Sequence, residues 1–433
     1  MIRVRHMAAA CIAAAPLPAM AQSPDVTRFE VAGIPVIYKP IQANDVVAVR
    51  MYLRGGSASL TSANAGIESM MLALAEQGTR KYDKDAFASL ATTTGTNIGS
   101  EAGVDFSVLT MQGVRQNWEK AWDLFTQAAL APTFPESEVE LVRGQLVNAV
   151  KRRSDDPDNY LTYLADSLFY AGHPYSAVPA GTEASLKSIT RDALMAWHRQ
   201  RMTKDNLLLV VVGNVPRADL EAKVRQAFGG LPATGVRPRS VAAVTSVTPE
   251  LITIQRELPT NYITGYFHAP ALTSADFPAF RAAMDMLGYR LFEEVRTKRN
   301  LTYAVGAGLA NSQANRGRLY VTAVAPDTTM KVIFSTVSEL QTGSLDPARL
   351  AETTNSALTR YLMGQQTNMG QAAVLGLWEI SGGGWQNYSR FIESYKRVTA
   401  SDVQRVARQY LTRGRFVLIG DPTKLTRGIV LAF

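Results

Sequence analysis

Histidine and cysteine are the side chains that most often bind transition metals or act as nucleophiles, and this sequence has few of them. It contains four histidines and a single cysteine, Cys11. One cysteine excludes a disulfide framework, a CxxC redox centre and a thiolate zinc cluster. No two of the histidines at positions 6, 173, 198 and 268 have the spacing that places two ligands on one helix face. We therefore expect His173 and His198 to be ordinary surface or capping residues.

The composition is typical of a soluble globular protein with more than one domain. The chain has 433 residues, of which 46% are hydrophobic and 19% are charged, and one domain usually takes about 100–200 residues. The sequence lacks a Gly-x-Ser-x-Gly nucleophile elbow, a Gly-Lys phosphate loop and a dinucleotide-binding fingerprint. The absence of these motifs favours neither a serine hydrolase nor a nucleotide-dependent enzyme. We expect no nucleic-acid partner.

Two segments resemble the signatures of one peptidase family. Residues 66–79 read GIESMMLALAEQGT and resemble the metal-binding helix of the pitrilysin and mitochondrial processing peptidase family. Residues 291–303 read LFEEVRTKRNLTY and resemble the signature of the second half of that family. The layout around Arg143-Gly144, which precedes an Asp-Asp-Pro turn, also matches. The resemblance implies an α+β fold of two homologous α/β sandwich domains, with the metallopeptidase-like architecture of processing peptidases.

Members of that family carry His-x-x-Glu-His on the metal-binding helix. The two histidines share a helix face and bind zinc, the glutamate is the general base, and a distant glutamate completes the ligand set. Aligned on the glycines that flank the helix, this chain has Ser69 and Ala73 in place of the histidines and Leu72 in place of the base. The family's usual separation to the last ligand ends at Ala149. None of these four side chains is a usual zinc ligand or a general base.

Loss of the metal would remove the nucleophile of the reaction. Zinc lowers the pKa of bound water from about 15.7 to about 7, so a site without zinc supplies almost no hydroxide at neutral pH. We therefore expect this chain to bind no zinc and to have no catalytic activity alone. Glu68 and Glu76 lie close to the vacated positions. Because neither has a histidine partner, we expect them to face solvent or to cap charge.

The second signature keeps two residues that the resemblance assigns to substrate binding. In the family, an arginine and a tyrosine seven residues later hold the substrate backbone beside the scissile bond, and this chain has Arg296 and Tyr303 at that spacing. A guanidinium offers a rigid fork of hydrogen-bond donors, and a phenol can donate to a carbonyl or to a developing oxyanion. We expect Arg296 and Tyr303 to contact substrate.

The elements that must position these residues occur twice. A helical stretch after Thr190 leads to the apolar run 207–212, and a similar stretch after Thr399 leads to the apolar run 416–419. Both threonines stand where a helix N-cap would satisfy free amides. A region rich in glycine and proline, residues 229–249, separates the halves. These patterns predict an internal duplication of one domain, with strands at the start and end of each half and helices between them.

The predicted boundaries follow from these patterns and from the first residues. Positively charged residues near the N-terminus, a short apolar run and Ala-x-Ala before Gln22 predict a signal peptide at residues 1–21. We expect an N-terminal peptidase-like domain with the degenerate zinc site at residues 22–230, a linker at 231–249 and a C-terminal peptidase-like domain at 250–433. The leader and the absence of other cysteines favour the periplasm, and we expect no transmembrane span.

These observations predict a non-catalytic, substrate-binding subunit of a heteromeric periplasmic zinc peptidase. The partner would be a catalytic homologue that has the intact His-x-x-Glu-His motif and carries the zinc. This chain would supply Arg296 and Tyr303 to the partner's active site during proteolysis of extended peptides. Two alternatives stay open: a structural scaffold derived from the same fold, in which both residues are relics, and a stand-alone peptide-binding protein.

Overall fold

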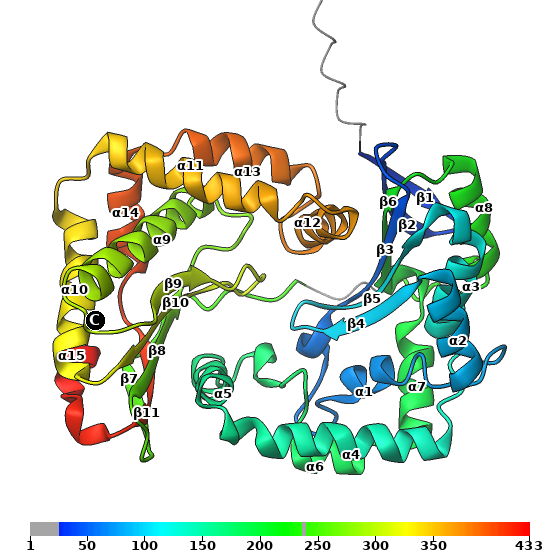
Figure 1. Ribbon diagram of the computed structural model, residues 1–433, viewed down its shortest axis with the longest axis horizontal. Helices are drawn as coiled ribbons and strands as arrows, with labels where there is room; N and C mark the ends of the chain where they lie inside the picture. Colours follow the sequence, from blue (N-terminus) through cyan, green and yellow to red (C-terminus); the bar gives the residue numbers. More distant parts are fainter. Residues whose placement is uncertain (1–25, 236–239) are drawn as a thin grey trace, which may run out of the picture.

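Two mixed β-sheets, each with its own layer of helices, form the molecule (Figure 1). A computed structural model describes residues 26–235 and 240–433, so the predicted signal peptide and part of the predicted linker lie outside the described residues. The elements of the first half are β1 (Thr27–Val31), β2 (Ile34–Pro40), β3 (Val46–Arg54), α1 (Ile67–Ala73), α2 (Lys84–Thr94), β4 (Asn97–Ala102), β5 (Phe106–Val114), α3 (Trp118–Leu130), α4 (Glu136–Arg152), α5 (Pro157–Phe169), α6 (Glu183–Ser188), α7 (Arg191–Arg201), β6 (Leu207–Gly213) and α8 (Arg217–Phe228).

The second half follows the same general order of strands around a group of helices. Its elements are β7 (Glu250–Gln255), β8 (Asn261–His268), α9 (Phe277–Leu291), a π-helical turn (Phe292–Thr297), β9 (Val305–Leu309), β10 (Arg316–Ala323), α10 (Pro326–Thr342), α11 (Pro347–Met363), α12 (Asn368–Ile380), α13 (Asn387–Lys396), α14 (Ala400–Tyr410), β11 (Arg415–Gly420) and α15 (Arg427–Leu431). Among the helices of the described ranges, none is long and apolar enough to cross a lipid bilayer.

The sheet topology repeats between the halves. The first sheet has the order β1-β2-β6-β3-β5-β4 and the second has β7-β11-β8-β10-β9. In each, the late strand inserts beside an early one in parallel, β6 against β2 and β11 against β7, while the next neighbours pair antiparallel. Thr190 and Thr399 cap the helices that lead into β6 and β11, as predicted. The α+β class and the repeated domain are confirmed, whereas the boundary positions remain a prediction.

Burial on both faces explains why β6 and β11 are continuous apolar runs. Every residue of β6 is buried. Successive side chains of a strand point to opposite faces, so Leu207, Leu209 and Val211 join the core of the first domain, while the alternate residues meet α12 of the second domain. In β11, Phe416 and Leu418 face their own domain and the alternate residues meet α5 of the first domain.

Each domain thus contributes one helix to the face of the other domain's sheet that is turned toward it (Figure 1). The contact of α12 with β3 is very close at Gly376, where an added Cβ would lie 2.2 Å from the Tyr52 ring. The Tyr52 hydroxyl donates to the carbonyl of Ala372, 3.3 Å away. Glycine is required at this point because no larger residue leaves room for the ring. The exchange of helices fixes the relative position of the two domains.

A buried carboxylate joins segments from both domains. Asp105, in the turn between β4 and β5, accepts hydrogen bonds from the Tyr175 hydroxyl, from the backbone N–H of Gln313 at 2.8 Å and from the Ser381 hydroxyl at 2.9 Å. Gln313 belongs to the β9–β10 loop, and Ser381 follows α12 directly. Burial raises the pKa of Asp105, and the three donors offset part of that rise. One side chain therefore holds three distant segments of the chain together.

Removal of this carboxylate should destabilise the domain junction. In Asp105→Ala, three buried donors lose their acceptor, and we expect the free energy of unfolding to fall by about 2–4 kcal/mol. The measurement is chemical denaturation monitored by circular dichroism. Asp155→Ala removes an exposed carboxylate for comparison and should change the stability by less than about 0.5 kcal/mol. Equal stability of the two variants would contradict the assigned role of Asp105.

Candidate functional site

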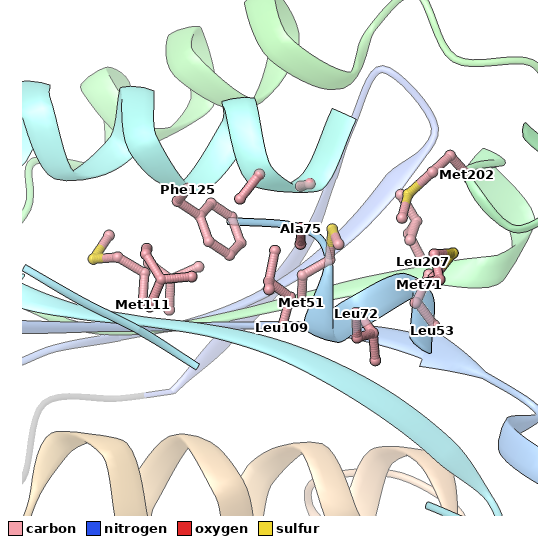
Figure 2. Close-up of a cluster of buried hydrophobic side chains, with 14 of the residues drawn as sticks. Met51, Leu53, Met71, Leu72, Ala75, Leu109, Met111, Phe125, Met202 and Leu207 are labelled. Carbon is pink, nitrogen blue, oxygen red and sulfur yellow. The ribbon is translucent and has the colours of Figure 1, made fainter. Parts of the chain in front are cut away.

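Helix α1, which resembles a metal-binding helix, is short and tightly packed at its start. It begins after Gly66, whose φ of 89° is in the left-handed region. A Cβ there would lie 2.8 Å from the Cα of Gly181, so glycine is required both for the turn and for the close approach. Leu72 is buried and belongs to the hydrophobic core of the first domain, together with Leu53 and Met71 (Figure 2). The position at which the resemblance expects a general base is therefore part of the apolar core.

Two of the predicted vacated positions line one cavity. Ser69 on α1 and Ala149 on α4 both lie on the wall of a cavity of about 570 Å³ between the two domains. Ala73 is partly buried and packs against the core. The tertiary structure therefore brings α1 and α4 together at the place where the resemblance expects a metal.

The residues at this place do not fit a zinc ion. A hydroxyl and three alkyl side chains offer none of the imidazole, thiolate or carboxylate groups that bind zinc tightly. Within the described ranges, no group of three or more His, Cys, Asp or Glu side chains could hold a metal ion. We therefore assign no chemical step to a metal in this chain.

The expectation that Glu68 faces solvent is wrong. Its side chain is buried, with 1% of the residue exposed. One carboxylate oxygen lies 3.0 Å from the Arg201 Nε, and the other accepts from the Ser107 hydroxyl at 2.7 Å. Arg201 also donates to the carbonyl of Arg54. These partners, at the end of α7 and on β5, satisfy the carboxylate without water, so the ion pair fixes α1 inside the domain.

Glu76 differs from the prediction as well. Its carboxyl is partly buried just after α1, and burial raises its pKa to about 7. No ion-pair partner for it is found in the part of the chain that the structure describes. Glu76 therefore caps no charge and is not freely exposed.

His173 and His198 have capping roles, as predicted. The His173 ring accepts from the backbone N–H of Tyr175 at the start of a short 3₁₀ turn. The His198 Nε2 lies 2.8 Å from the carbonyl of Ala129 in the last turn of α3, and burial lowers the pKa of His198. Both rings satisfy backbone groups at helix ends.

Arg296 and Tyr303 lie together on the surface of the second domain. Arg296 is in the π-helical turn, and its guanidinium carbon is 4.2 Å from the centre of the Tyr303 ring and 4.9 Å from that of Phe292. Tyr303 is 80% exposed and Phe292 is 47% exposed. Neither Arg296 nor Tyr303 lines the cavity between the domains. Arg296 and Tyr303 therefore lie close to each other, but they do not lie beside helix α1 of the same chain.

The charged neighbours of Arg296 pair with other residues, so its guanidinium is available to bind another molecule. Lys298 and Arg299, its close neighbours in sequence, both form ion pairs with Glu294. No carboxylate pairs with Arg296 in the ranges that the structure describes. We call Phe292, Arg296 and Tyr303 the aromatic–arginine patch. Phe292 was not predicted, although an aromatic residue four positions before Arg296 on a helix is a signal that indicates stacking.

The Glu68–Arg201 pair should contribute strongly to stability. Arg201→Met leaves a carboxylate buried without its charged partner, and we expect the free energy of unfolding to fall by about 3–5 kcal/mol. The double variant Glu68→Met, Arg201→Met should recover part of that loss because it removes the unpaired charge. Denaturant titration of all three proteins measures the difference.

An exposed ion pair provides the control for this experiment. Arg217→Met breaks the pair with Glu221 on α8, in which both side chains are substantially exposed, and its cost should stay below about 1 kcal/mol. A loss in Arg201→Met as small as that in Arg217→Met would show that the buried pair contributes little.

Known proteins match both halves of this chain. Residues 36–182 match the family described as Insulinase (Peptidase family M16), and residues 188–356 match the family described as Peptidase M16 inactive domain. A solved structure from Pseudomonas fluorescens, described as a peptidase M16 inactive domain, has a TM-score of 0.82 and 21% identity, and the match covers 92% of this chain and 98% of that chain. A solved protease from Helicobacter pylori has a TM-score of 0.85 and 17% identity, with 92% and 100% covered.

The curated relatives include proteins with different names. An uncharacterized zinc protease of Mycobacterium tuberculosis is 26% identical over 308 residues, which cover 68% of this chain and 69% of that protein. A protein of Helicobacter pylori named as a non-peptidase homolog is 20% identical over 293 residues, which cover 66% of this chain and 67% of that protein. This chain is thus similar to proteins described as inactive or non-peptidase members as well as to proteins named proteases. The adjoining family matches and the shared fold show that this chain belongs to peptidase family M16, as its two signature segments predicted.

Proposed function

We propose that this chain is the non-catalytic, substrate-binding subunit of a heteromeric periplasmic zinc peptidase. The observation that carries this assignment is the contrast between two places in the chain. The helix that resembles a metal-binding helix has no zinc ligand, and its base position is in the hydrophobic core. The aromatic–arginine patch, in contrast, is exposed and keeps its hydrogen-bonding groups available.

Exposure of the patch favours a role in contact with another molecule. A tyrosine that is 80% exposed contributes little to the stability of its own domain. The stacking of the guanidinium on the ring holds both groups in one orientation by a cation–π interaction. In this arrangement, the Arg296 N–H groups and the Tyr303 hydroxyl are positioned to bind acceptors on a second molecule.

The chemistry of peptide hydrolysis uses such donors. In a two-chain enzyme, a catalytic homologue with an intact His-x-x-Glu-His motif would supply the metal and the general base. Arg296 and Tyr303 would donate hydrogen bonds to carbonyl oxygens of an extended peptide and to the negative charge that develops beside the scissile bond. The names of the inactive and non-peptidase relatives support the absence of catalysis by this chain alone. Export through a leader at residues 1–21 would bring this chain to the periplasm, where the catalytic homologue would also have to be present.

The isolated chain should contain no stoichiometric zinc and should cleave no peptide. The reason is that the hydroxyl and alkyl side chains at the four vacated positions cannot replace imidazole and carboxylate ligands. Elemental analysis of the purified protein and an assay with a mixture of unstructured peptides test this expectation. One zinc per chain that is lost together with peptidase activity on chelation would overturn the assignment.

With a catalytic homologue, Arg296→Ala and Tyr303→Phe should reduce peptide cleavage without separating the subunits. A hydrogen bond to a charged group contributes roughly 1.5–3 kcal/mol, which corresponds to a loss of about 10- to 150-fold in rate for Arg296→Ala. The loss for Tyr303→Phe should be smaller because its donor is neutral. Steady-state kinetics of the reconstituted pair measures kcat and KM, and size-exclusion chromatography confirms assembly.

Neighbouring residues provide matched controls for both variants. Arg299→Ala removes an exposed arginine that already pairs with Glu294, and Tyr289→Phe removes the hydroxyl of another exposed tyrosine. Both should leave cleavage within about two-fold of the wild type. Full activity of the double variant Arg296→Ala, Tyr303→Phe would instead favour a structural scaffold. Peptide binding by the isolated chain with no effect on any homologue would favour a stand-alone binding protein.

A further inference from the structure

The cavity between the domains has no role in the function proposed above. Its volume of about 570 Å³ is within the range of small-molecule sites, roughly 300–1,000 Å³. Its walls come from α1, α4, α5, the segment 175–180 and the loop between β9 and β10. Because Ser69 and Ala149 are small, the space beside α1 and α4 is open.

The cavity contains one guanidinium without a charged partner. Two arginines line it, Arg153 and Arg316. Arg316 donates two hydrogen bonds to one Asp166 oxygen, from Nε at 3.1 Å and from Nη2 at 2.8 Å. Arg153 stacks on the Tyr163 ring at 4.3 Å and donates a long hydrogen bond of 3.4 Å to the carbonyl of Gly181. No carboxylate of the described residues pairs with Arg153, so its charge is uncompensated inside the cavity.

The remaining wall combines aliphatic side chains with several hydroxyl groups. Aliphatic side chains from α4 and from the segment before α6 line one side, among them Leu146, Val150 and Val178. Hydroxyl groups lie on the wall as well, those of Ser69 and Ser176 among them, and so does the Asp166 carboxylate that pairs with Arg316. Because Asp166 offsets the charge of Arg316, the cavity has an aliphatic wall and one net positive charge, on Arg153, and is complementary to an apolar molecule that carries one negative charge.

We infer that this cavity binds a small carboxylic acid with an apolar body, whose carboxylate pairs with Arg153 and whose body packs on the aliphatic wall. Two sources have this chemistry. One is the free C-terminus of a short peptide that ends in an apolar residue, and the other is a simple aliphatic or aromatic monocarboxylic acid. Such a site goes beyond the proposed subunit role, because it needs neither a partner chain nor the aromatic–arginine patch.

Calorimetric titration of the isolated full chain tests this site. The probes are alanyl-alanyl-phenylalanine with a free carboxylate, the same tripeptide as its C-terminal amide, and 4-phenylbutyrate. We expect at least one acid to bind and the amide to bind about ten-fold or more weakly, because only the carboxylate forms a charged hydrogen bond with Arg153. Binding of the tripeptide acid alone identifies a peptide end as the ligand, and binding of 4-phenylbutyrate alone identifies a simple acid. No binding of either acid at about 1 mM, or equal binding of acid and amide, would overturn the inference.

Paired variants locate the binding. Arg153→Gln should lower the affinity for the acid about ten-fold or more. Arg152→Gln, which changes the adjacent exposed residue, should leave the affinity unchanged. Ala149→Trp should weaken binding by placing a large ring in the cavity, whereas Asn148→Trp, at an exposed position that does not line the cavity, should not. Circular dichroism checks that each variant is folded. Unchanged affinity in both Arg153→Gln and Ala149→Trp would exclude this cavity.

The subunit role is tested independently of this site. Arg296→Ala should bind the acid with wild-type affinity because Arg296 does not line the cavity. A failure of acid binding therefore leaves the kinetic test with the catalytic homologue intact, and a failure of that kinetic test leaves the titration intact. An Arg296→Ala variant that loses acid binding would contradict the separation of the two sites.

Discussion

Strands β6 and β11 carry apolar side chains on both faces, and each sheet therefore needs an apolar layer on both sides. The helices of one domain cover only one face of its sheet. The second layer comes from the other domain, since α12 packs on the first sheet and α5 packs on the second. Burial of apolar surface stabilises a structure by about 25 cal/mol per Å², so neither domain can withdraw its helix without exposing two faces to water.

This exchange determines where the functional groups lie. It places the β9–β10 loop of the second domain against the first domain, where Gln313 reaches the buried Asp105. The same contact closes one wall of the cavity beside α1. The π-helical turn after α9 is not part of this junction, and Arg296 and Tyr303 stay at the surface. One chain thus has the cavity beside α1 between its two domains and the aromatic–arginine patch on its surface.

Helix α1, which resembles a metal-binding helix, is held in place by contacts of its own side chains. A zinc ion cross-links a helix to its neighbours through its ligands. In this chain, the Glu68–Arg201 ion pair and the packing of Leu72 join α1 to β5, α7 and the core instead. The helix keeps its place because hydrogen bonds and apolar contacts hold it, while the small residues Ser69 and Ala149 leave open space where ligands would stand.

The sequence alone determined the features that depend on residue identity or on short-range pattern. Absence of zinc ligands at Ser69, Ala73 and Ala149 is a matter of side-chain chemistry, and the N-caps at Thr190 and Thr399 depend on hydrogen bonds within one helical turn. The repeat of helix and apolar strand predicted the duplicated domain for the same reason.

Only the tertiary structure decided which distant groups meet. Arg201, which neutralises Glu68, is 133 residues away in sequence, and local pattern alone favoured an exposed glutamate. Asp105 likewise reaches partners that the chain supplies much later, and the exposure of Tyr303 depends on which surfaces the two domains bury. Such contacts arise because apolar strands must be covered on both faces. The helix that covers each face brings together side chains that lie far apart in the sequence, and no local sequence pattern predicts these pairs.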